Sequence, residues 1–166
     1  NNMKILDLPC GTGKLGTIFS SHPVHVTAGD ISESMLRLAK NEYNNEKVDF
    51  KVIDALNIPY DDDYFDIIIC LRLFQRIPSD TRLQILSEFR RTGKKNLIVS
   101  YSFISIWQKI RFKLKKMLVK DFNFFYSDKI KQIELELEQS GFQVLSKKIV
   151  LSFLSSEIIF LSRIRK

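Results

Sequence analysis

The sequence predicts an α/β protein in which a doubly wound, mostly parallel sheet carries helices on both faces. Three observations predict this class: strand-like and helix-like stretches alternate, the first strand-like stretch runs into a glycine-rich loop, and residues 65–70 form the apolar run FDIIIC. Such alternation is typical of a parallel sheet with crossover helices. An apolar run of this kind is typical of a strand covered on both faces.

Each element is expected from a local pattern. The expected strands are residues 4–8, 24–28, 48–53, 65–70, 96–101, 142–151 and 157–163, of which the last two form a hairpin. The expected helices are residues 14–21, a helix capped by Ser32, a helix from Ser79 to Gly93, and residues 127–140, stopped by Gly141. Serine is a favoured N-cap, and glycine is favoured just after a helix C-terminus.

Length and composition indicate one globular domain. The chain has 166 residues, of which 45% are hydrophobic and 27% charged. No apolar run approaches the ~18 residues needed to span a bilayer, and no secretory signal is visible. Cys10 and Cys70 are the only cysteines, which gives neither a disulfide framework nor a C-x-x-C metal pair. We therefore expect a cytoplasmic protein.

The stretch LDLPCGTGKLG at residues 6–16 raises the question of which nucleotide this fold binds. Residues 11–16 match the dinucleotide fingerprint G-x-G-x-x-G, whereas residues 7–13 read D-x-P-C-G-x-G. Ligands of doubly wound sheets bind at the carboxyl ends of the strands. Because a lone glycine pattern discriminates weakly, the residues that follow the other strands must decide.

Three carboxylates lie near the carboxyl ends of strands, and two of them favour S-adenosylmethionine over a nicotinamide cofactor. Asp30 suits the ribose hydroxyls of either ligand. Asp54 beside Ala55 suits the amino group and ring of adenine. Asp7 lies inside the first strand, where dinucleotide-binding folds usually have an apolar residue, and its carboxylate suits the ammonium group of S-adenosylmethionine, directly or through water.

The chain resembles the class I S-adenosylmethionine-dependent methyltransferases of the small type-11 kind. The matching pieces are ILDLPCGTG, VTAGDISESMLRLAK, VDFKVIDALNIPYDDDYFDIIIC and LSEFRRTGKKNLIVS, which occur in family order between residues 5 and 100. The resemblance implies a Rossmann-like sheet of order 3-2-1-4-5-7-6 with strand 7 antiparallel. It also implies S-adenosylmethionine as the cofactor. The match to G-x-G-x-x-G is then accidental, and arises because Gly16 stands at the position of the last glycine.

The resemblance also implies a set of cofactor-binding residues. The methionine part is lined by Asp7, Pro9, Cys10, Gly11, Thr12 and Gly13, the ribose by Asp30, the adenine by Ile31, Met35, Asp54 and Ala55, and the sulfonium by Cys70 and Leu71.

Two features depart from the family pattern. Pro9 replaces the first glycine of the loop, which removes one backbone N–H and changes the contacts that the loop can make. Family members usually carry one or two helices before the first strand, and these cover the cofactor. Either this sequence is truncated or its site is unusually open.

Candidate acceptor-binding residues follow the fourth and fifth strands. They are Arg72, Gln75, Arg76, Tyr101 and Trp107. The alternative for these positions is a capped helix and a solvated turn. No general base is evident, because His22 and His25 precede the second strand and lie at the amino end of the sheet. Residues 61–63, three aspartates, are interpreted as an acidic loop tip, and no metal is expected.

Residues 102–126 are expected to be a helical insertion. Of the net charge of +7, +6 comes from basic residues between positions 109 and 120, with no acid among them. Apolar residues recur at helical spacing through 103–117, so residues 102–120 predict an amphipathic basic helix. We favour a lid over the acceptor pocket, as this region provides in related methyltransferases. The alternative is peripheral contact of residues 103–120 with an anionic membrane.

The function predicted by these patterns is methyl transfer from S-adenosylmethionine to a small-molecule or lipid-like acceptor by in-line displacement. A nucleic-acid acceptor is not expected, because the Asp/Asn-Pro-Pro-aromatic motif of base methyltransferases is missing after the fourth strand, where the chain reads CLRLFQ. The alternatives are a non-catalytic or truncated domain that keeps this fold and, less favoured, a nicotinamide-dependent oxidoreductase.

Overall fold

The computed structural model describes residues 3–43, 47–103, 128–152 and 155–165 of the chain. The strands are β1 (Met3–Asp7), β2 (Val24–Asp30), β3 (Val48–Val52), β4 (Phe65–Cys70), β5 (Gly93–Ser102), β6 (Phe142–Ser152) and β7 (Ser155–Ile164). The helices are α1 (Gly16–Ser20), α2 (Glu33–Glu42), the 3₁₀ turn η1 (Phe74–Arg76), α3 (Ser79–Thr92) and α5 (Ile130–Gln139).

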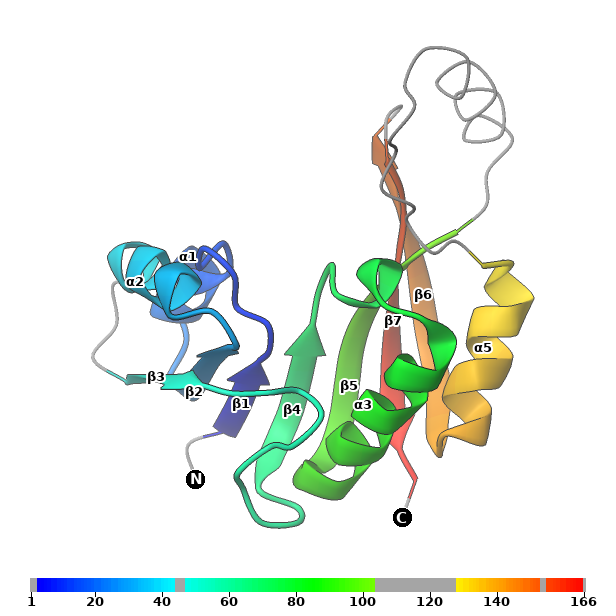
Figure 1. Cartoon of the computed structure of the whole chain (residues 1–166), viewed down its shortest axis with the longest axis horizontal. Helices are drawn as coiled ribbons and strands as arrows, with labels where there is room; N and C mark the ends of the chain where they lie inside the picture. The colour runs from blue at the N-terminus through cyan, green and yellow to red at the C-terminus, as the bar shows by residue number, and fades with distance from the viewer. Residues whose placement is uncertain (1–2, 44–46, 104–127, 153–154, 166) are drawn as a thin grey trace.

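The described strands form one seven-stranded sheet of order β3-β2-β1-β4-β5-β7-β6 (Figure 1). Neighbours from β3 to β5 are parallel, and β7 runs antiparallel to both β5 and β6. This confirms the expected fold class, including the antiparallel seventh strand. The parallel strands bring the segments after β1, β2, β3 and β4 to one edge of the sheet, where ligands of doubly wound folds bind.

Alternating side chains along the strands build a core on each face of the sheet. Leu6 of β1 and Ile68 of β4 belong to the cluster that packs on α3 and α5. Their neighbours Ile5 and Ile69 belong to a second cluster that packs on α1 and α2. Because successive side chains of a strand point to opposite faces, the two clusters lie on opposite sides of the sheet. Helices therefore cover both faces, as expected.

Two glycines end helices for different reasons. Gly141 follows α5 with φ +88°, the left-handed conformation that favours glycine at this place. Gly93 follows α3 in an extended conformation, with φ −91°. A Cβ on Gly93 would lie 2.6 Å from the carbonyl oxygen of Phe89 and 2.5 Å from Cδ1 of Ile164. Gly93 is therefore required by close packing between α3 and β7, and not by a left-handed turn.

Three expected element boundaries are corrected. The helix expected at 14–21 begins at Gly16, because residues 11–15 form turns. Ser102 belongs to β5 and Phe103 forms a bridge with Asp128, so the helix expected over 102–120 does not include these first two residues. The helix expected from residue 127 begins at Ile130. The remainder of the expected insertion, with Trp107, lies outside the described residues.

The bridge between Phe103 and Asp128 joins the two sides of the segment between them. The backbone N–H of Asp128 also donates to the carbonyl oxygen of Ser102 at 3.3 Å. Phe103 and Asp128, which flank residues 104–127 in the sequence, thus lie side by side at the carboxyl end of β5. In the part of the chain that the structure describes, none of the helices has the length and apolar character needed to cross a membrane.

Candidate cofactor site

The loop after β1 is fixed to both neighbouring strands. The backbone N–H of Leu8 donates to the carbonyl oxygen of Ile69 in β4 at 2.9 Å, and that of Cys10 donates to Gly29 in β2 at 2.7 Å. The Leu8–Pro9 peptide bond is cis, and Pro9 itself is partly buried. The loop therefore takes its position from the carboxyl ends of two strands that flank β1.

Asp30 ties this loop to the start of α2. Its Oδ2 accepts a hydrogen bond from the backbone N–H of Gly11 at 3.0 Å, and its Oδ1 accepts one from Ser32 at 2.9 Å. Ser32 in turn caps α2 by accepting from the backbone N–H of Met35. Asp30 is 6% exposed. A carboxylate has about four acceptor positions, so two remain for the hydroxyls of a ribose.

The three glycines of GTGKLG have different surroundings. Gly11 has φ +54°, and a Cβ built on it meets no atom within 4 Å. Gly13 has φ +81°, and its Cβ would lie 2.9 Å from the Cα and the carbonyl oxygen of Ala39. A Cβ on Gly16 would lie 2.6 Å from the carbonyl oxygen of Glu42. Gly13 and Gly16 thus permit close packing on α2, whereas Gly11 borders open space that a ligand can occupy.

Asp7 lies beneath this loop as a buried carboxyl group, 2% exposed. Its Oδ2 accepts a hydrogen bond of 2.5 Å from the hydroxyl of Tyr43, which follows α2. Burial and the charge of Asp30 raise the pKa of Asp7 to about 7, although the bond from Tyr43 acts to lower it. Asp7 thus changes charge near neutral pH, unlike an exposed aspartate.

Sequence reasoning missed Tyr43. This residue is also part of a chance match to a catalytic motif of another enzyme class. Tyr43 and Lys47 have the Tyr-x-x-x-Lys spacing of a nicotinamide-dependent catalytic pair. In the structure, Tyr43 is buried with its hydroxyl on Asp7, while Lys47 is exposed. The spacing therefore does not indicate an oxidoreductase site.

The residues expected at the adenine lie along the same edge. Ile31 and Met35 are exposed at the start of α2, and Ala55 is partly buried after β3. The exposed Asp54 accepts a hydrogen bond from the backbone N–H of Leu56 at 2.9 Å and so also begins a turn. Ile31 and Met35 thus offer apolar surface, and Asp54 a carboxylate, at one end of the sheet.

An ion pair on α3 holds the loop that follows Asp54, and sequence reasoning did not find it. Glu88 accepts from the backbone N–H of Ile58 at 2.9 Å. Arg91 donates to both oxygens of Glu88 and to the carbonyl oxygens of Ile58 and Tyr60. Glu88 and Arg91 therefore connect the loop between β3 and β4 to α3.

The segment after β4 is the expected acceptor side. Arg72 has φ +63°, and its backbone N–H donates to the Oγ of buried Ser100 at 2.8 Å. Arg72 and Arg76 are exposed. Gln75 is partly buried, and its Oε1 is shielded from solvent without a hydrogen-bond partner among the described residues. Ser100, which sequence reasoning missed, thus fixes the turn that presents these side chains.

Cys70 and Leu71 lie where β4 ends. The side chain of Cys70 is fully buried in the core and Leu71 is partly buried. Burial raises the pKa of the Cys70 thiol, and it raises the pKa of Cys10, with help from the charges of Asp7 and Asp30, to about 12. Both thiols remain protonated at neutral pH, so they are packing residues and not nucleophiles.

Tyr101 is placed differently from the expectation that it binds an acceptor. Its side chain is 1% exposed and stands edge-on to the rings of Phe74 and Phe160. Its hydroxyl donates to Glu136 of α5 at 2.9 Å, and the guanidinium of Arg82 lies 5.5 Å from its ring centre. Tyr101 is therefore part of a buried network between β5, α3 and α5 and does not face the acceptor side.

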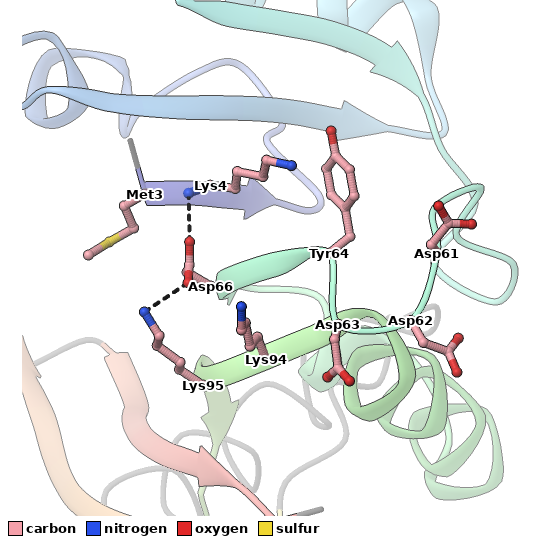
Figure 2. Close-up of a pocket in the computed structure, with 9 residues that line it drawn as sticks. All are labelled: Met3, Lys4, Asp61, Asp62, Asp63, Tyr64, Asp66, Lys94 and Lys95. Carbon is pink, nitrogen blue, oxygen red and sulfur yellow. Dashed lines mark hydrogen bonds and ion pairs between the residues drawn. The ribbon is translucent and has the colours of Figure 1, made fainter. Parts of the chain in front are cut away.

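A pocket of about 570 Å³ lies at the opposite edge of the sheet, at the amino ends of β1, β4 and β5 (Figure 2). Figure 2 shows Asp66 between the backbone N–H of Lys4 and the amino group of Lys95, at 3.1 and 2.9 Å. The bond with Lys95, and to a smaller extent that with Lys4, holds the pKa of Asp66 below its usual value. The aspartates at 61–63 line this pocket, away from the cofactor loop.

His25 also lies at the amino edge of the sheet, as expected. The expectation that it precedes the second strand is wrong, because it is the second residue of β2. Its Nε2 lies 3.2 Å from Oδ2 of Asp49. Within the described ranges, no three His, Cys, Asp or Glu side chains are grouped so that they could hold a metal ion.

The fold and this site define a class I S-adenosylmethionine-dependent methyltransferase architecture. Residues 5–96, more than half of the chain, match the family model described as "Methyltransferase domain". The chain therefore belongs to this family, whose cofactor is S-adenosylmethionine.

Known proteins similar to the chain include two methyltransferases of quinone metabolism. Demethylmenaquinone methyltransferase of Clavibacter sepedonicus is 39% identical over 64 residues, or 38% of this chain and 26% of that protein. Ubiquinone biosynthesis O-methyltransferase of Coxiella burnetii is 32% identical over 81 residues, or 48% of this chain and 35% of that protein. The matches thus span between 26% and 35% of the length of these two relatives.

Solved structures share the fold along the whole chain. Magnesium protoporphyrin IX methyltransferase of Synechocystis PCC 6803, solved with bound S-adenosylhomocysteine (SAH), has a TM-score of 0.85 at 18% identity. The superposition covers 100% of this chain and 75% of that one.

Proposed function

We propose that this chain transfers the methyl group of S-adenosylmethionine to a small-molecule or lipid-like acceptor, and that the acceptor is a quinone-type ring. The observation that carries the cofactor assignment is the buried carboxylate of Asp30 bonded to Gly11 beside open space. The names of the two curated relatives support the acceptor class.

The residues present fit this cofactor. Bound S-adenosylmethionine supplies an electrophilic methyl group on a sulfonium, and transfer requires the acceptor atom within about 3–3.5 Å. The residues of the chain then have to bind the cofactor and orient it toward the acceptor. Asp30 would accept from the ribose, Asp54 from the adenine amino group, and the open side of Gly11 would admit the methionine part next to Asp7.

Gln75 is the best-placed group for orienting an acceptor. Its buried Oε1 has no hydrogen-bond partner in the part of the chain that the structure describes, and such an atom gains free energy when a donor reaches it. A ring hydroxyl is such a donor. The insertion that follows β5 in the sequence is proposed as a lid over the acceptor; an anionic membrane is the alternative partner for its basic residues between positions 109 and 120.

Replacing Asp30 by alanine should weaken S-adenosylmethionine binding by about 100-fold or more. The substitution removes hydrogen bonds from the ribose and from Gly11, and bonds to a charged group contribute about 1.5–3 kcal/mol each. Calorimetric titration with S-adenosylmethionine and, separately, with NADH gives both affinities. The matched control is Asp49→Ala, since Asp49 is exposed on β3 and pairs with His25.

Selective binding of S-adenosylmethionine that Asp30→Ala weakens and Asp49→Ala leaves unchanged would support the proposed function. Selective NADH binding would contradict it. If neither ligand binds the wild-type chain, the alternative of a non-catalytic or truncated domain that keeps this fold takes its place, and binding to a longer chain distinguishes these two.

A Gln75→Leu variant should lose methyl transfer to a hydroxylated or demethylated quinone by about tenfold, with unchanged affinity for S-adenosylmethionine. Leucine keeps much of the side-chain volume and removes the Oε1 of Gln75. Transfer of isotope-labelled methyl is measured with the quinone in neutral or anionic vesicles at low and high salt. Equal rates for Gln75→Leu and wild type would contradict the role of Gln75.

The same measurement tests the insertion. Transfer that depends on anionic lipid and falls with salt would favour membrane contact over a lid.

A further inference from the structure

Tyr43 is joined to the cofactor site by a contact that its position in the chain does not suggest. It follows α2, 36 residues after Asp7, and its hydroxyl donates to Oδ2 of Asp7 at 2.5 Å. The ring is buried, stacked on Phe19 with a centroid distance of 6.2 Å and edge-on to Phe50 at 5.5 Å. Aromatic packing thus fixes the direction in which the hydroxyl points.

The surroundings of Asp7 oppose its charged form. The carboxyl group is shielded from water between two parallel strands. Besides Tyr43, the ionisable groups that interact with it are Asp30 from β2, Cys10 from the loop and, from the other face of the sheet, Cys70 of β4. These three groups, a second carboxylate and two protonated thiols, provide no opposite charge. The Tyr43 hydroxyl alone donates a hydrogen bond to Asp7 in the described residues.

We propose that Tyr43 is a positioning residue for the cofactor: its hydroxyl orients Asp7 and stabilises the carboxylate that receives the ammonium group of the bound amino acid part. The inference rests on the proposed function, because it requires the methionine part to lie beside Asp7. Tyr43 does not itself need to touch the cofactor. It acts by keeping its neighbour ionised and in one orientation in a place that otherwise favours the neutral acid.

This arrangement makes cofactor affinity depend on pH in a stated direction. Burial, partly offset by Tyr43, raises the pKa of Asp7 to about 7. A cationic group prefers the ionised carboxylate, so affinity rises with pH up to that value and levels off above it. Loss of the Tyr43 hydroxyl removes a bond to the charged form, which moves the pKa of Asp7, and the midpoint of the affinity profile, upward.

The test is the binding of S-adenosylhomocysteine between pH 5.5 and 8.5 to wild type and to Tyr43→Phe. This ligand keeps the ammonium group and has no methyl group to transfer. Phenylalanine keeps the ring between Phe19 and Phe50 and removes only the hydroxyl. We expect the midpoint to rise by about one pH unit, since a hydrogen bond to a charged group corresponds to about that shift. The affinity should then fall about fivefold at pH 7, and by about tenfold only at pH values well below both midpoints.

Two controls separate positioning from general loss of structure. Tyr64→Phe removes a hydroxyl at the amino edge of the sheet and should leave the profile unchanged. Asp7→Asn, which cannot ionise, should bind weakly without the pH midpoint, and adding Tyr43→Phe to it should have no further effect. 5′-Methylthioadenosine, which lacks the amino acid part, should show no midpoint near pH 7 with any variant.

Identical pH profiles for folded Tyr43→Phe and wild type would overturn the role of Tyr43 while leaving the proposed function intact. A uniform loss of affinity at every pH, for both ligands, would also overturn it, because that result indicates only a structural defect. If S-adenosylhomocysteine and S-adenosylmethionine both fail to bind wild type, the proposed function fails and the role of Tyr43 fails with it.

Discussion

Replacing Arg82 by methionine is expected to lower the free energy of unfolding by about 3–5 kcal/mol, the range for removing one partner of a buried ion pair. Arg82 is 4% exposed at the start of α3 and lies 2.9 Å from carboxylate oxygens of both Glu136 and Asp128. Among the described residues, Glu136, 13% exposed, would keep only the Tyr101 hydroxyl as partner. Chemical denaturation at pH 7 measures the change.

Arg37→Met is the matched control for Arg82→Met. Arg37 also pairs with a glutamate, Glu33, but both side chains are at least 70% exposed, so its loss should change stability by less than about 0.5 kcal/mol. Adding Glu136→Gln to Arg82→Met should restore part of the stability, because glutamine is neutral and still accepts from Tyr101. A loss below about 1 kcal/mol for Arg82→Met would contradict the importance of the buried network.

Gly13→Ala and Gly11→Ala should separate the two functions of the loop glycines. At Gly13, with φ +81°, the added Cβ would lie 2.9 Å from the backbone of Ala39. Backbone strain of about 1–2 kcal/mol adds to about 1–3 kcal/mol of overpacking, so a loss of about 2–5 kcal/mol is expected. At Gly11, where the Cβ meets nothing within 4 Å, only the strain of about 1–2 kcal/mol remains.

Among the variants that fold, Gly11→Ala should lose more ligand affinity than Gly13→Ala, although Gly13→Ala loses more stability. The methyl group of Gly11→Ala projects into the open space proposed for the cofactor, so S-adenosylmethionine affinity should fall by about tenfold or more, equivalent to at least about 1.4 kcal/mol. Thermal unfolding and calorimetric titration of both variants measure the two effects. Equal stability losses, or full affinity in Gly11→Ala, would contradict this separation of packing from binding.

Structural features that depend on a few neighbouring residues were predictable from the sequence. The strands, the Ser32 cap, the Gly141 stop and the position of the cofactor loop follow from hydrophobic periodicity and turn residues, and the resemblance supplied the strand order. The candidate cofactor carboxylates were also found, because the carboxyl ends of parallel strands meet at one edge of the sheet.

Contacts between distant segments were not predictable in the same way. The bonds of Tyr43 to Asp7 and of Ser100 to Arg72 join residues 36 and 28 positions apart and carry no local signature. Tyr101 is different, because a signal existed. Leu97, Val99 and Tyr101 alternate along β5, which places all three on the buried face. Its polar hydroxyl at the end of a strand suggested an acceptor residue, while the alternation indicated the core.

The bridge between Phe103 and Asp128 has a consequence for how such a protein can diversify. The flanking residues Phe103 and Asp128 form a bridge with each other, and Asp128 also pairs with Arg82. The entropy of closing a loop between fixed ends changes only slowly with its length. Insertions, deletions and exchanges in this segment therefore have little effect on the stability of the sheet. Natural selection can alter the acceptor side of the molecule while the nucleotide side, several strands away, stays the same.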